Sequence, residues 1–264
     1  MASRLGLRSV ALGYLTLLLG VPVGLVLYRT FEHGLAAPIN SLTSADGAHA
    51  FWLTLEITAI AVPLNTIFGV ATALLLARRK FPGRTFLNGL VDLPFAISPV
   101  VVGLALLLVY GRTGWFGGWL ADNGIRVIFS TPGMVLATIF VSLPFVVRET
   151  VPVLQELGTD QEEAAATLGA SSWQTFWRVT LPAIRWGVGY GVVLTTARAL
   201  GEFGAVSVVS GRLVGQTETL TLRVQNEFER FDLTGAYAAS ALLAVMAIAV
   251  LLVMTALERR RRTT

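Results

Sequence analysis

The sequence predicts an all-α polytopic membrane protein with six transmembrane helices and with both termini in the cytoplasm. Three observations support this fold class. The 264-residue chain is 54% hydrophobic and only 14% charged, and its mean hydropathy of +0.69 is far above that of a soluble domain. Six apolar stretches each approach the roughly 20 residues that a helix needs to cross the hydrocarbon core. Basic residues gather at the ends of these stretches, as membrane topology requires.

The predicted spans follow one another along the chain with polar loops between them. In order they are 9–28, 52–77, 90–110, 132–147, 184–209 and 236–257. A signal peptide is the alternative for the first stretch, because Arg4 and Arg8 precede it. Its apolar run is long and no small-x-small cleavage pattern follows closely, so we expect an uncleaved helix.

The distribution of lysine and arginine sets the predicted orientation. With the N-terminus inside, thirteen basic residues lie on the cytoplasmic side and six on the outer side. The four consecutive arginines 259–262 contribute to this excess. Positive charge marks cytoplasmic loops, so both termini and the loop 148–183 are predicted to be cytoplasmic.

The residue inventory excludes several kinds of function. The chain has no cysteine and only two histidines, which leaves no thiolate or histidine cluster for a metal. Its single lysine, Lys80, lies between Arg79 and Phe81, whereas a phosphate-binding P-loop needs Gly-Lys followed by Ser or Thr. We therefore expect no ATPase site, no metal and no cofactor in this chain. Its basic residues form no stripe, which argues against nucleic-acid binding.

The loop 148–183 contains a polar, two-part helical stretch. Thr159 with Glu162, and Ser171 with Gln174, both have the spacing of a capping box, and Gly169 is a natural residue for a helix end. We predict a short helix from Asp160, a glycine corner, and a second helix at the membrane surface that ends at Leu181-Pro182. An ordinary surface helix in a loop is the alternative.

This loop resembles the EAA loop of ABC importer permeases, in which it forms the coupling helix that fits a cleft on the ATP-binding subunit. The resemblance is carried by Glu163-Ala164-Ala165, Gly169 and Leu181-Pro182, with Val179 where the family usually has isoleucine. It implies that ATP and Mg²⁺ bind to two separate ATPase subunits, that a second, related permease completes the pore, and that an external binding protein delivers the substrate. It also implies a permease domain over 51–257, after an N-terminal helix and external loop at 1–50 and before a basic tail at 258–264.

The predicted fifth span contains a charged pair. Arg198 and Glu202 are four residues apart and share a helix face with Thr195 and with small residues at 187, 191 and 205. One interpretation is close helix packing around a structural ion pair, and the other is the lining of a translocation pathway.

The stretch 197–211 resembles the oxyanion branch of the same permease family, and 215–232 resembles its sulfate/thiosulfate members. The resemblance implies import of sulfate or thiosulfate across a bacterial-type plasma membrane. Molybdate or tungstate import is the first alternative. An ion-coupled secondary anion transporter is the second, with Glu56 and Glu202 as the carboxylates available for a relay.

Overall fold

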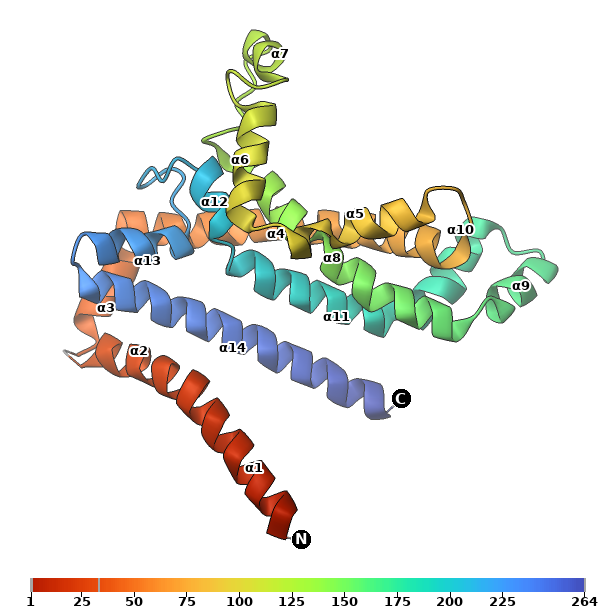
Figure 1. Cartoon of the computed structure of the whole chain (residues 1–264), viewed down its shortest axis with the longest axis horizontal. Coiled ribbons are helices and arrows are strands. Elements are labelled where there is room, and N and C mark those ends of the chain that lie inside the picture. The colour runs from red at the N-terminus through yellow and green to blue at the C-terminus, as the bar shows by residue number, and fades with distance from the viewer. Residues whose placement is uncertain (1, 33, 264) are drawn as a thin grey trace.

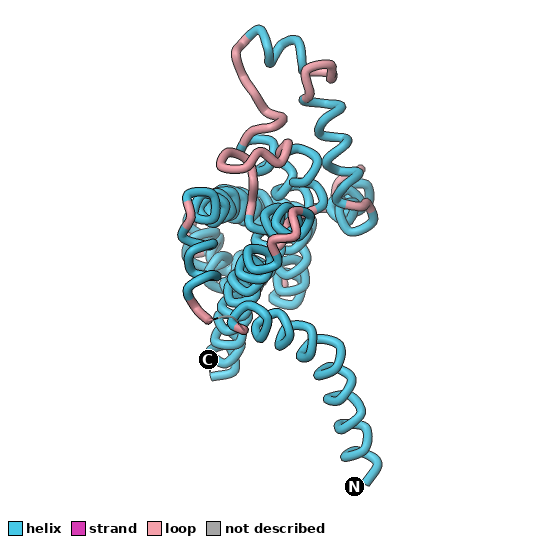
Figure 2. Tube along the Cα trace, turned by 90° about the vertical axis from the view of Figure 1, so that its left-hand side faces the viewer, coloured by secondary structure: helices cyan, strands magenta, loops and turns pink. Residues whose placement is uncertain are grey.

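The computed structural model describes residues 2–32 and 34–263, and every regular element in this part of the chain is a helix (Figures 1 and 2). The π-helical turns are labelled η. The elements are α1 (Ala2–Leu15), η1 (Thr16–Gly20), α2 (Val21–Phe31), α3 (Ala36–Thr43), α4 (Ala45–Arg78), α5 (Arg84–Ala96), α6 (Pro99–Tyr110), α7 (Gly117–Asp122), α8 (Thr131–Leu157), α9 (Asp160–Thr167), α10 (Ser172–Thr175), η2 (Phe176–Thr180), α11 (Leu181–Leu200), α12 (Gly204–Val209), α13 (Leu220–Glu229) and α14 (Leu233–Thr263).

The core is formed by α4, α8 and α11, which lie side by side (Figure 1). Small residues let these helices approach closely. A Cβ added to Gly69 of α4 would lie 2.7 Å from the Val146 Cβ, and one added to Gly191 of α11 would lie 2.8 Å from the Val146 Cα. Val146 is fully buried at this crossing. In a membrane such close contact replaces the hydrophobic effect as the force that holds helices together.

Four helical stretches are long and apolar enough to cross a membrane in the described part of the chain. They are Val10–Phe31, Ala45–Arg78, Thr131–Leu157 and Leu233–Leu257. They correspond to the first, second, fourth and sixth predicted spans. Multi-pass insertion is therefore supported.

The third predicted span, 90–110, is not one straight helix. Helices α5 and α6 meet at an angle of 112°, and α6 points away from the core with α7 at its tip (Figure 1). The break falls at Ile97 and Ser98, whose ψ angles of 136° and 134° are not helical, directly before Pro99. Proline disfavours helical geometry in the residue before it and has no N–H to continue the ladder.

The fifth predicted span, 184–209, is also interrupted. Helix α11 ends at Leu200, a turn follows, and α12 begins at Gly204. With Arg185 and Arg198 in its sequence, α11 is not among the helices apolar enough to count as a span by composition.

The loop before α11 differs from the prediction at both ends. Helix α8 continues to Leu157, so the non-helical connection begins at Gly158. The second loop helix does not stop at Leu181-Pro182, because α10, η2 and α11 follow one another with helical backbone at each junction. The Leu181 N–H bonds to the Phe176 carbonyl, five residues back. This π turn directly precedes Pro182, whose ring cannot fit a regular helical interior.

The N-terminal part of the chain lies outside the core. Helices α1 and α2 form a curved arm, and its end at α1 diverges from the rest of the chain (Figures 1 and 2). Near the other end, the Thr30 hydroxyl of α2 donates to the Tyr237 carbonyl of α14 at 3.1 Å.

Candidate functional site

Helix α9 forms the turn of the loop between α8 and α11, and glycines bound it at both ends. Gly158 and Gly169 have φ values of 64° and 85°, a region that favours glycine. At the C-terminal end the Gly169 N–H bonds to the Ala166 carbonyl and the Ala170 N–H bonds to the Ala165 carbonyl, both at 3.0 Å. This is a Schellman motif, and the predicted corner at Gly169 is confirmed.

One of the two predicted capping boxes is present. The Ser171 N–H donates to Gln174 Oε1 at 2.9 Å, and the Gln174 N–H donates to Ser171 Oγ at 3.3 Å. The box predicted at Thr159 is wrong, since its hydroxyl donates to the carboxylate of Glu163 at 2.7 Å. The carboxylate of Glu162 turns inward instead.

Glu162 ties the loop to the membrane helices. Its carboxylate accepts two hydrogen bonds of 3.1 Å from Arg78, the last residue of α4, and one of 3.0 Å from the Thr180 hydroxyl just before α11. Arg78 also donates to the Leu154 carbonyl of α8 at 2.7 Å. One ion pair thus fixes the base of α9 to the ends of α4 and α8 and to the start of α11. We call these four residues the Glu162 clamp.

The residues predicted to contact an ATPase subunit are distributed over two elements. On α9, Glu163 and Ala164 are exposed and Ala165 is half-buried, while Gly169 beyond its end is exposed. Leu168 at the tip of the loop is 88% exposed. Leu181 and Pro182 lie at the start of α11, where Leu181 packs against the buried cluster between α4 and α8 and Pro182 is exposed. The loop therefore presents a small, partly apolar face, and Leu181 belongs to its base.

The predicted charged pair forms beside the break after α11. Arg198 Nη2 lies 2.6 Å from Glu202 Oε2, and the side chains are 29% and 2% exposed. Since α11 ends at Leu200, the pair spans the helix end rather than one regular helix face. Glu202 Oε1 accepts from the Ala205 N–H at 2.8 Å, so the same carboxylate stabilises the first turn of α12. Arg198 is the half-buried member of the pair and Glu202 the buried one.

Thr195 lies one turn before Arg198 and is fully buried. Gly187 and Gly191 on the same helix pack against α8, where added Cβ atoms would lie 2.9 Å from the Glu149 carbonyl and 2.8 Å from the Val146 Cα. Gly187 and Gly191 of the small-residue stripe thus pack against α8, and Arg198 is the one partly exposed member of the stripe.

A buried polar network behind the charged pair was missed by the sequence analysis. Arg223 of α13 is 7% exposed and lies 3.4 Å from Glu218 and 2.9 Å from Glu227. The Asn226 amide also donates to Glu218. The spacings of five and four residues between the charges were the signal available in the sequence. The Thr221 hydroxyl of the same helix donates to the Glu202 backbone carbonyl at 2.8 Å, so α13 also contacts the turn that carries the charged pair.

Residues 65–263 match the family described as "binding-protein-dependent transport system inner membrane component". The chain belongs to this permease family. The resemblance to importer permeases is therefore confirmed. The permease is 52% identical over 256 residues to the sulfate transport system permease protein CysW of Synechococcus elongatus, in an alignment that covers 97% of this chain and 90% of that protein.

Two more comparisons extend this result. The permease is 36% identical over 247 residues to the sulfate transport system permease protein CysT of Escherichia coli, covering 94% of this chain and 89% of that one. A solved bacterial alginate ABC transporter, in complex with an alginate pentasaccharide-bound periplasmic protein, matches with a TM-score of 0.77 and 18% identity, covering 98% of this chain and 94% of that chain. At this identity the likeness shows the fold alone.

Proposed function

We propose that this chain is the transmembrane permease subunit of an ATP-driven importer for sulfate or thiosulfate in the bacterial inner membrane. The observation that carries the proposal is the loop around α9. Its tip at Leu168 is exposed and free to contact another protein, while its base is held by the Glu162 clamp to the ends of α4, α8 and α11. A force applied to α9 therefore acts on these helices. The identity to CysW supports sulfate as the substrate.

The proposed membrane arrangement has six crossings. They are the four apolar helices, the bent pair α5–α6, and α11 with α12. Both termini and α9 face the cytoplasm, as the basic residues indicate. The N-terminal helix with its external loop covers 1–50, the permease domain 51–257 and the basic tail 258–264. Helix α9 is the coupling helix, and Glu163, Ala164, Ala165 and Gly169 are its contact residues, while Leu181 and Pro182 support its base.

The partners follow from the energetics and from the relatives. Importing a dianion against an inside-negative potential costs roughly 5 kcal/mol per 100 mV, at about 2.3 kcal/mol per charge. Two ATPase subunits, which bind ATP and Mg²⁺, supply this energy, and this chain itself catalyses no reaction. Its similarity to both CysW and CysT supports pairing with a second, related permease. An external sulfate-binding protein delivers the anion.

The proposed pathway passes the open end of α11. Arg198 keeps part of its guanidinium exposed and offers a passing anion a brief attraction, while Glu202 limits the strength of binding. Thr195 is fully buried and acts in this pathway only if the helices separate. The Arg198→Gln variant is expected to reduce uptake at a normal protein level. Wild-type uptake by that variant contradicts this role.

The experiment that tests the function is initial-rate uptake of labelled sulfate by cells with and without this chain. Uptake that needs the chain, stops on ATP depletion and resists trace molybdate supports the proposal. Abolition by low molybdate concentrations moves the substrate to molybdate or tungstate. Uptake that survives ATP depletion but stops with an uncoupler indicates an ion-coupled secondary transporter instead.

A further inference from the structure

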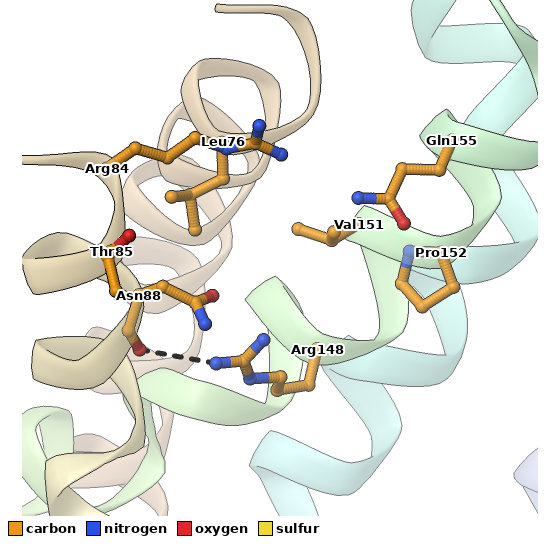
Figure 3. Close-up of a pocket in the computed structure, with 8 residues that line it drawn as sticks. All are labelled: Leu76, Arg84, Thr85, Asn88, Arg148, Val151, Pro152 and Gln155. Carbon is orange, nitrogen blue, oxygen red and sulfur yellow. Dashed lines mark hydrogen bonds between the residues drawn. The ribbon is translucent and has the colours of Figure 1, made fainter. Parts of the chain in front are cut away.

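A cavity of about 450 Å³ lies between α5 and α8, and its lining includes no member of the charged pair or of the Glu162 clamp (Figure 3). This volume is within the usual range for small-ligand sites, about 300–1,000 Å³. It is lined by Leu76, Arg84, Thr85, Asn88, Arg148, Val151, Pro152 and Gln155. None of these residues is acidic, and two are arginines.

Arg84 has no ionic partner among the residues that the structure describes. It is the first residue of α5 and is half-buried at the rim of the cavity. In the described part of the chain no acidic side chain forms an ion pair with it, in contrast to Arg78 and Arg198. A guanidinium that faces a cavity without a carboxylate attracts an anion.

The Arg148 guanidinium is held in place by hydrogen bonds that use only some of its donor groups. Its Nε and Nη2 donate to the two oxygens of Asp92 at 2.7 and 2.5 Å, and Nη2 also donates to the Asn88 carbonyl at 3.3 Å (Figure 3). These bonds orient the guanidinium and leave its Nη1 group without a protein acceptor among the described residues. Arg84, Arg148 and Asp92 together carry one net positive charge.

Neutral donors complete the cavity. Thr85 and Asn88 are exposed on the same helix as Arg84, and neither their hydroxyl nor their side-chain amide has a protein partner in the part of the chain described. Figure 3 shows side chains from α5 and α8 facing each other across the cavity. Guanidinium groups with hydroxyl and amide donors suit the oxygens of a tetrahedral anion.

We infer that the cavity between α5 and α8 binds a tetrahedral oxyanion of the sulfate class through Arg84, Arg148, Thr85 and Asn88. Its cytoplasmic location rests on the orientation proposed above, because Arg79 and Lys80 lie in the adjoining loop. The binding itself does not depend on which anion the complex transports. The phosphate of an anionic lipid has the same chemistry and is the competing source.

The absence of cysteine makes a site-specific test possible. A single cysteine in place of Gln155, which lines the cavity and is exposed, reports its occupancy. The full chain is kept in membranes of neutral lipid without ATP and treated with a membrane-impermeant maleimide. The matched control is Ser172→Cys, an exposed position on α10 outside the cavity.

Inorganic sulfate at about ten times its dissociation constant is expected to slow labelling of Gln155→Cys about tenfold, since only the unoccupied fraction reacts. Chloride at equal ionic strength has no such effect, and the Ser172→Cys control is unaffected. In the Gln155→Cys chain, adding Arg84→Gln is expected to raise the sulfate concentration needed for half-maximal protection by roughly tenfold or more. Because the Arg84 side chain has no ionic partner among the described residues, this variant is expected to fold.

Three results overturn parts of the inference separately. Equal labelling with and without sulfate in the Arg84-containing protein excludes the site. Protection by anionic lipid but not by free sulfate assigns the cavity to a headgroup phosphate. Labelling from right-side-out but not inside-out vesicles overturns the proposed orientation and leaves the binding result unchanged.

Discussion

Replacing Glu162 by glutamine keeps the size of the side chain and removes the charge that holds α9. Three hydrogen bonds from Arg78 and one from Thr180 lose their ionised acceptor. Hydrogen bonds to charged groups stabilise by about 1.5–3 kcal/mol, and breaking a fully buried pair costs about 3–5 kcal/mol. The Arg78 and Glu162 side chains are 15% and 23% exposed, so we expect the lower range, about 2 kcal/mol.

Hydrogen exchange of the α9 amides in the full, membrane-embedded chain measures this change. A loss of about 2 kcal/mol in local stability speeds exchange roughly 30-fold. The matched control is Glu163→Gln, because this neighbouring carboxylate is exposed and, among the described residues, bonds only to the Thr159 hydroxyl. Exchange in the control is expected to stay close to wild type. Equal exchange in both variants, or no change in Glu162→Gln, refutes the clamp.

Three other substitutions test the packing. Gly191→Ala is expected to destabilise the chain by about 1–3 kcal/mol in a thermal melt, because the added Cβ would lie 2.8 Å from the Val146 Cα. Gly189→Ala is the neutral control, since a Cβ there would have nothing within 4 Å. If both melt alike, the α8–α11 contact is described wrongly. Gly169→Ala is expected to loosen the α9 corner by about 1 kcal/mol, since φ is 85°, and unchanged α9 exchange would contradict this. Arg223→Met leaves two buried carboxylates without their cation and is expected to cost about 3–5 kcal/mol of stability. The amount of folded chain recovered in detergent measures this loss. Wild-type yield and melting temperature would show that the network does not stabilise the fold.

Hydropathy and local spacing predicted the parts of the fold that depend on neighbouring residues. Long apolar runs gave the helices now seen as α2, α4, α8 and α14. The corner at Gly169 and the capping box at Ser171 also depend only on residues a few positions away. Such features follow from backbone geometry and need no knowledge of the fold.

The local sequence does not predict which prolines interrupt a helix in this chain. Pro63 and Pro144 lie inside α4 and α8, which continue through them, whereas the chain turns by 112° before Pro99. The residue type is the same in all three places. Packing against neighbouring helices decides whether a membrane helix tolerates a proline, and a single sequence does not contain that packing.

The Glu162 clamp was missed for a similar reason. Arg78 and Glu162 are 84 residues apart, so no helical or turn spacing links them. The sequence favoured a capping role for Glu162 and drew attention to Glu163 beside it. In the structure the inward carboxylate anchors the loop, and the outward one lies on its exposed face. Only the tertiary structure distinguishes the roles of these two adjacent glutamates.

The most direct test of the central claim is the initial rate of labelled sulfate uptake by the Leu168→Asp variant, normalised to the amount of chain in the membrane. Leu168 is 88% exposed at the tip of the loop, so the change leaves the chain's own packing intact while placing a charge on the proposed ATPase contact. The account predicts a normal amount of chain and uptake reduced to background. Uptake at the wild-type rate would show that the loop around α9 does not couple this permease to its ATPase.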